Sequence, residues 1–276
     1  MLHQKIDPST NVDRNLCAEN VSISIGKTPI VRDVSFEAAS GELLAIIGPS
    51  GSGKTTLLRA LTGELSYEGH AFLSGRELGG MSAEDQAVLR GVLPQISQIS
   101  FPLTVSEVVA LGLLDRRAGR LQRETRISEA LAKVGLAGFE GRTYQDLSGG
   151  EQQRTQLARV LCQVWDPVPA DGQPRWLFLD EPVSSLDIKH QYQIMHLAAD
   201  YAARGGGVVA VMHDLNLTAE FANKVLVMKC GKQLAYGSNE SVMCSGTLTT
   251  AYDFQLDLVE VRSGRKLFLH PAPVKI

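Results

Sequence analysis

The chain has 276 residues, enough for one large domain or two small ones, and its apolar (44%) and charged (21%) fractions are ordinary for a globular protein. A formal net charge of −3 gives no electrostatic reason to expect a nucleic-acid partner. No apolar run approaches the ~20 residues of a membrane span. The polar residues 1–15 lack the apolar stretch of a signal peptide. We therefore expect a flexible N-terminal tail over 1–15, reduced cysteine thiols and a cytoplasmic protein.

The first part of the chain is strand-rich. Apolar runs separated by turn residues predict strands over 16–26, 28–42 and 43–47. A glycine-rich segment then leads into a predicted helix over 55–63, with Gly63 at its C-terminal end. Residues 68–78 predict a hairpin.

The middle of the chain has a helical pattern. Ser82 with Asp85, and Thr104 with Glu107, fit the capping box that starts a helix. The pattern predicts helices over four ranges: 82–91, 104–117, 123–136 and 151–165.

Strands and helices alternate again after a connection rich in proline and glycine. The predicted strands are 176–180, 206–213 and 225–229, with helices over 188–204 and 215–224. This alternation predicts a parallel sheet wrapped by helices, so the fold class is α/β with an inserted helical subdomain over about 96–150. Residues 257–270 predict a hairpin that turns at Ser263-Gly264.

Residues 48–55, GPSGSGKT, match the phosphate-binding pattern G-x-x-x-x-G-K-[ST] in full. Glycines allow backbone N–H groups to surround phosphates, and the helix N-terminus adds its positive end. Lys54 can reach the β- and γ-phosphates, and the Thr55 hydroxyl can ligate Mg²⁺. The predicted nucleotide-binding residues are Gly48, Pro49, Ser50, Gly51, Ser52, Gly53, Lys54, Thr55 and Thr56.

Two later strands end in chemically useful side chains. The buried run WLFLDE places Asp180 where it can hold Mg²⁺ and Glu181 where it can polarise a water molecule. The run VVAVMH ends in His213, which a neighbouring strand would bring to the γ-phosphate. Gln95, at the entry to the helical insert, could contact Mg²⁺ or the attacking water. Each residue alone would be unremarkable, and the phosphate-binding pattern gives them a common site.

The stretch LSGGEQQR, residues 147–154, has paired glycines that run into a predicted helix and therefore resembles half of a second anion site. Together, in this order, these motifs resemble the ATP-binding subunits of ABC transporters. The resemblance covers about residues 17–235 and implies a P-loop NTPase: a RecA-like core with an N-terminal antiparallel β subdomain and an inserted α-helical subdomain. It implies an ATPase domain over 16–246 and a C-terminal extension over 247–276.

The resemblance also implies the functional residues. ATP and Mg²⁺ are the expected cofactors. The implied metal-binding residues are Thr55, Gln95 and Asp180, and the implied catalytic residues are Lys54, Gln95, Glu181 and His213.

In this family two cassettes pair head to tail, so a second copy of the chain would be a partner. The residues implied to contact the other subunit's ATP are Ser148, Gly149, Gly150, Glu151 and, in the loop 184–187, Asp187. The other implied partners are transmembrane permease subunits and, indirectly, a periplasmic or surface substrate-binding protein. The segment from Gln95 to about Leu114 would border the groove for a permease helix. The implied location is the cytoplasmic face of the inner membrane.

The stretch FPLTVSEVVALG resembles importer ATPases of the haem, iron-siderophore and cobalamin group. Two further stretches look closest to haem-import subunits: PRWLFLDEPVSSLDIKHQYQ and MHDLNLTAEFANKVLVMKCGK. Import of an iron-siderophore or cobalamin is the alternative, followed by a non-transport ABC protein of translation or repair. A P-loop kinase or GTPase would lack LSGGEQQR. Val183 stands where the family commonly has threonine. Ile25 stands where many cassettes place an aromatic side chain against adenine, so the usual base contact is in question.

Overall fold

The computed structural model describes residues 14–95, 99–114, 119–261 and 265–269. Almost all of the predicted N-terminal tail, and the predicted turn at Ser263-Gly264, lie outside the described residues. Within the described part of the chain, no helix is both long and apolar enough to cross a membrane.

Most strands belong to one sheet whose order is β5-β4-β1-β2-β10-β9-β3-β8-β7-β6. A separate hairpin pairs β11 with β12. The strand bounds are β1 (Leu16–Ile25), β2 (Thr28–Ala38), β3 (Leu43–Ile47), β4 (Glu68–Leu73), β5 (Arg76–Glu77), β6 (Arg90–Leu93), β7 (Trp176–Asp180), β8 (Gly207–Val211), β9 (Lys224–Lys229), β10 (Lys232–Ser238), β11 (Asp257–Val261) and β12 (Arg265–Leu269).

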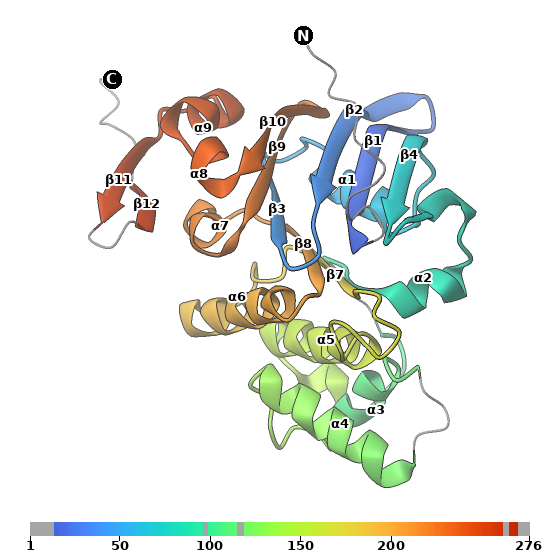
Figure 1. Cartoon of the computed structure of the whole chain (residues 1–276). Coiled ribbons are helices and arrows are strands. Elements are labelled where there is room, and N and C mark those ends of the chain that lie inside the picture. The colour runs from blue at the N-terminus through green and yellow to red at the C-terminus, as the bar shows by residue number, and fades with distance from the viewer. Residues whose placement is uncertain (1–13, 96–98, 115–118, 262–264, 270–276) are drawn as a thin grey trace.

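The sheet has a parallel part and an antiparallel part. Strands β6, β7, β8, β3 and β9 pair in parallel, whereas β1 pairs antiparallel with both β2 and β4. Every residue of β3, β7 and β8 is buried, which explains their uninterrupted apolar sequences. Figure 1 shows β1, β2 and β4 gathered at one side of the molecule. The predicted α/β class is confirmed.

Some helices cover the parallel strands, and others form a separate layer below the sheet in Figure 1. Their bounds are α1 (Lys54–Leu61), α2 (Ala83–Leu89), α3 (Val105–Ala110), α4 (Arg120–Lys133), α5 (Gly149–Gln163), α6 (Ile188–Ala203), α7 (Leu215–Phe221), α8 (Asn239–Val242) and α9 (Ser245–Tyr252). Helices α3, α4 and α5 lie together on the side of the molecule away from the antiparallel strands (Figure 1).

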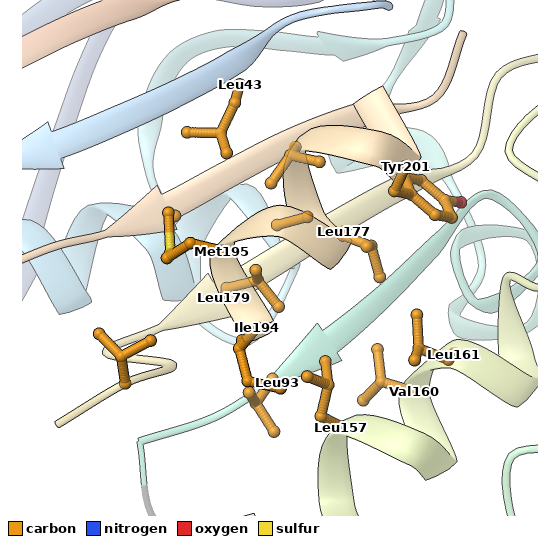
Figure 2. Close-up of a cluster of buried hydrophobic side chains, with 14 of the residues drawn as sticks. Leu43, Leu93, Leu157, Val160, Leu161, Leu177, Leu179, Ile194, Met195 and Tyr201 are labelled. Atoms are coloured by element: carbon orange, nitrogen blue, oxygen red, sulfur yellow. The ribbon is translucent and has the colours of Figure 1, made fainter. Parts of the chain in front are cut away.

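A continuous hydrophobic core joins the helical layer to the sheet. Side chains of α5, such as Leu157, and of α6, such as Ile194, pack against Leu177 and Leu179 of β7 (Figure 2). Helix α5 carries most of the LSGGEQQR motif, and α6 follows the loop after Glu181. Both helices therefore pack on the same buried strand. A second core fills the space between α1 and the antiparallel strands.

Several predicted boundaries were wrong, among them three in the middle of the chain. The helix predicted over 82–91 ends at Leu89, and Arg90 begins β6. Gly91 allows the strand to lie against α5. A Cβ at this position would lie 2.7 Å from the Val160 side chain and would prevent that close approach. The helix predicted over 104–117 ends at Ala110, where Gly112 packs against the Arg159 carbonyl. The third helix, α4, begins at Arg120 instead of 123.

All four cysteines are free thiols, as expected. Burial raises the pKa of Cys17 to about 11 and that of Cys162 to about 12. Both thiols therefore stay protonated and unreactive at neutral pH.

Gly207 is expected to be essential for stability because it faces the buried indole of Trp176 across the β7–β8 pair. A Cβ at Gly207 would lie 2.3 Å from ring carbons of Trp176, which is fully buried. Gly207→Ala should lower the free energy of unfolding by about 1–3 kcal/mol, the usual cost of overpacking. Urea denaturation measures this, with Gly141→Ala as the control because its Cβ would meet nothing within 4 Å. Equal stability of the two variants would contradict this account of the β7–β8 contact.

Candidate nucleotide site

The loop between β3 and α1 forms a backbone cradle. Gly48, Gly51 and Gly53 have positive φ angles of 145°, 76° and 96°. A Cβ on Gly48 would lie 2.1 Å from the carbonyl oxygen of Met228, so only glycine allows the loop to pack this closely against β9. The loop ends at Lys54, the first residue of α1, so the N–H groups of the first helical turn face the cradle.

The cradle holds a buried cation. Lys54 is 5% exposed, and its Nζ donates to the carbonyl oxygens of Gly48 (2.9 Å) and Pro49 (3.0 Å). Burial lowers the pKa of the Lys54 ammonium, while the nearby carboxylates of Glu181 and Asp180 oppose that shift. An anion placed at this point would gain a charge-assisted hydrogen bond.

Ser52 offers a second contact for an anion. Its side chain is 2% exposed, and its Oγ is buried with no hydrogen-bond partner among the described residues. A buried hydroxyl without a partner costs about 1–3 kcal/mol. A phosphate oxygen in the cradle is the kind of acceptor that would remove this cost.

Oxygen ligands for a cation lie at the next strand end. The Thr55 hydroxyl donates to Oδ1 of Asp180 at 3.1 Å, and Asp180 is 3% exposed. Burial raises the pKa of Asp180, and the bond from Thr55 partly offsets the shift. A hydroxyl and a carboxylate this close together suit a small hard cation such as Mg²⁺.

Glu181 and His213 meet at the ends of β7 and β8. Oε1 of Glu181 lies 2.6 Å from Nε2 of His213. The Glu181 backbone is left-handed, with φ of 51°, and its N–H donates to the carbonyl of Val211 at 3.2 Å. This conformation turns the chain sharply after Asp180, and strain of this kind is often found at functional sites.

A cavity of about 460 Å³ joins these groups. Its lining contains Ile30, the segment 50–56, Gln95, Glu181 and His213. Gln95 therefore does reach the cradle in space, 40 residues along the chain from Thr55. Ile30 was not singled out from the sequence, since an isolated strand isoleucine carries no chemical pattern. Ile25, at the end of β1, is 52% exposed and does not line the cavity.

The LSGGEQQR motif lies apart from this cavity. Ser148 caps α5, accepting from the Glu151 N–H while the Glu151 carboxylate accepts from the Ser148 N–H. Ser148 and Gly149 are exposed, and neither they nor Asp187 line the cavity. A helix N-terminus with an exposed serine and an exposed glycine is open to an anion that comes from outside the chain.

These features define a class of protein. A parallel sheet, a glycine-rich cradle with a buried lysine, and acidic residues at the adjacent strand ends are the parts of a P-loop nucleoside triphosphatase.

Comparison with known proteins gives the family. A sequence profile described as "ABC transporter" matches residues 31–184. A protein of Jannaschia sp. (strain CCS1), named "Hemin import ATP-binding protein HmuV", is 54% identical over 93% of this chain and 94% of its own length. A protein of Mesorhizobium japonicum with the same name is 54% identical over 92% of this chain and 97% of its own. A dimeric ATP-binding cassette, solved in a post-hydrolysis state with ADP and Pi, is 27% identical with a TM-score of 0.71, over 81% of this chain and 98% of that one.

The chain belongs to the ABC transporter family, as an ATP-binding subunit with ATPase activity. The expected fold and the expected family are thus confirmed, and ATP is the nucleotide that this chain binds.

Ile25 stands where many cassettes place an aromatic side chain against adenine, and this predicts weak discrimination between ATP and GTP. Isoleucine offers no π-face, and base stacking on an aromatic side chain is worth roughly 1–3 kcal/mol in nucleic-acid complexes. We expect GTP to bind within about tenfold of ATP, and Ile25→Tyr to tighten ATP binding by about tenfold with maximal turnover unchanged. Competition between the two nucleotides measures both effects. Leu121→Tyr, at an exposed aliphatic position of α4, is the control. A strong preference for ATP in the unmodified protein, with no gain from Ile25→Tyr, would defeat this account.

Proposed function

We propose that this chain is the ATP-hydrolysing subunit of an ABC importer and powers the uptake of haem through a membrane permease. The observation that carries the substrate is the 54% identity over 93% of the chain to a protein named for hemin import. Iron-siderophore or cobalamin import would use the same ATPase geometry.

In the proposed site, Lys54, Ser52 and the amides of the segment 48–56 bind the phosphates. Thr55, Asp180 and Gln95 would hold Mg²⁺, whose charge would stabilise the phosphate oxygens. Glu181 orients the attacking water, and His213, 2.6 Å from its carboxylate, fixes that side chain and contacts the γ-phosphate edge. Burial of Lys54 and Asp180 supports their roles, because electrostatic interactions strengthen where water is excluded.

The proposed active unit is a head-to-tail pair of chains. Ser148, Gly149, Gly150 and Glu151 of one chain, with its Asp187, would contact the ATP in the cradle of the other. The separation of Ser148 from the cavity of its own chain supports this arrangement. A solved relative in the family is a dimer with ADP and Pi bound.

A groove suited to a permease lies between α2 and the helical layer. It has a volume of about 420 Å³, and its lining includes the apolar side chains of Val88, Leu113 and Leu114. Phe101 and Leu111 nearby in the sequence are 72% and 62% exposed. Apolar side chains that gather at an exposed groove favour a protein contact. We infer that a cytoplasmic helix of the permease docks here, which would place the chain at the cytoplasmic face of the membrane, below a substrate-binding protein outside.

Vesicles containing the matching permease and this chain test the substrate. With ATP and Mg²⁺ inside and haem delivered outside by its binding protein, haem should accumulate in the lumen. A chain carrying Glu181→Gln should bind ATP normally but accumulate haem at least about a hundredfold more slowly, because the group that orients water is lost.

Two outcomes separate the parts of the proposal. Uptake of a siderophore or cobalamin, with haem ignored, would refute the substrate and leave the ATPase intact. Unchanged uptake and hydrolysis with Glu181→Gln would refute the catalytic role of that residue.

A further inference from the structure

The carbonyl group of Glu181 is held by an unusual set of donors. It accepts from Nε2 of Gln153 at 2.9 Å, from the hydroxyl of Ser184 at 3.2 Å and from the N–H of Ser184 at 3.4 Å. The two Ser184 bonds belong to the turn itself. The bond from Gln153 comes from α5, 28 residues earlier in the chain. A distant helix thus anchors the left-handed peptide that aims the Glu181 carboxylate.

Gln153 belongs to the LSGGEQQR motif and lies about one turn after Gly149, the first residue of α5. Ser148 caps α5, and Gly150 in its first turn packs on the loop after Glu181, where a Cβ would meet the Ser185 carbonyl oxygen at 3.0 Å and the Leu186 side chain at 3.2 Å. The start of α5 and the turn after Glu181 are therefore in direct contact in two places. A shift of the α5 N-terminus would reach Glu181 without passing through the rest of the domain.

The polar group of Gln153 is needed for this contact. Its Oε1 atom is buried and has no hydrogen-bond partner within the described part of the chain. Burying an unpaired amide oxygen is unfavourable, and a methionine would fill the same space without that cost. Packing alone therefore does not account for glutamine here, whereas its donor to the Glu181 carbonyl does.

We propose that Gln153 is a positioning residue that couples the exposed N-terminus of α5 to Glu181 of the same chain. When the partner's ATP binds at Ser148 and Gly149, the α5 N-terminus is fixed, and Gln153 then sets the Glu181 peptide and its carboxylate. Each chain would thus orient its own water-activating residue most fully when its loop has closed on the other chain's ATP. This inference rests on the proposed role of Glu181 and on the proposed shared sites.

Gln152 provides a matched control on the same helix. Its Nε2 donates to the Tyr144 carbonyl at 3.2 Å, whereas the Nε2 of Gln153 donates to the Glu181 carbonyl. Gln153→Met and Gln152→Met each remove one side-chain amide donor from neighbouring positions of α5. Only the first breaks the bond to Glu181.

The test measures ATP turnover and ATP binding for the full chain. Gln153→Met should lower the maximal rate on the order of tenfold, the effect of losing one aligned hydrogen bond. It should leave the Kd for ATP within about twofold, because Lys54 and the cradle are untouched. The Hill coefficient for ATP should fall toward that of independent sites. Gln152→Met should change none of these quantities by more than about twofold.

A second variant keeps the inference testable if Gln153→Met folds poorly. In Gln153→Glu, the ionised carboxylate faces the Glu181 carbonyl and repels it, whereas the protonated acid can donate a hydrogen bond to it. The ratio of its rate to that of the unmodified protein should therefore rise as the pH is lowered, which a simple packing defect would not produce.

The outcomes are decisive in both directions. Unchanged turnover and cooperativity in Gln153→Met, equal losses in Gln152→Met, or a flat pH ratio in Gln153→Glu would overturn the coupling. Glu181→Gln, measured in parallel, separates this failure from that of the proposed function. If Glu181→Gln hydrolyses ATP normally, the assignment of Glu181 itself is wrong, whatever Gln153 does.

Discussion

The structure depends on bringing charged groups to the ends of strands that are buried on both faces. Strands β3, β7 and β8 pair in register, so that Ile46, Asp180 and Val211 lie side by side. The cradle follows β3, Glu181 follows Asp180 at the end of β7, and His213 lies two residues after the end of β8. The apolar runs supply the stability that fixes these positions, and the strand ends supply the chemistry, as in other α/β proteins with ligands at the carboxyl edge of the sheet.

This arrangement leaves charges in an environment that disfavours them. Burial lowers the pKa of Lys54 and raises that of Asp180, so both charged forms are destabilised relative to water. A phosphate against Lys54 and Ser52, together with a cation against Asp180 and Thr55, would compensate each group. The groups that a bound phosphate and cation would stabilise are therefore already in place before the nucleotide binds. In the proposed dimer, the anion that binds the exposed N-terminus of α5 comes from a second chain.

Much of this could be predicted from the sequence, because local patterns determine it. The uninterrupted apolar runs ending in Asp180 and His213 indicated buried parallel strands, and GPSGSGKT indicated the cradle. The order of the motifs indicated the family. Gln95 could be placed in the site only by its context, at the entry to the helical insert and beside a phosphate-binding pattern, since an exposed glutamine in a loop has no pattern of its own.

Contacts between distant segments could not be predicted. Arg90 and Gly91 continue a helical pattern, and only the pairing with β7 and the close approach of Val160 to Gly91 make them part of a strand. Strand β10 and helices α8 and α9 were not predicted, because their short, mixed sequences have no clear period. The bond from Gln153 to Glu181 joins two motifs that were each recognised, but no sequence pattern shows which side chain of one meets the backbone of the other.

The central claim is that each ATP is held by two chains, and complementation tests it most directly. Lys54→Ala destroys the cradle, and Gly149→Arg blocks the exposed end of α5, where a Cβ would meet nothing within 4 Å in its own chain. Each variant alone, and the double variant, should be inactive. A mixture of the two single variants should recover part of the ATP hydrolysis, because a mixed dimer contains one site with an intact cradle and an intact α5 end. Activity in the mixture no higher than that of the double variant would contradict the shared site.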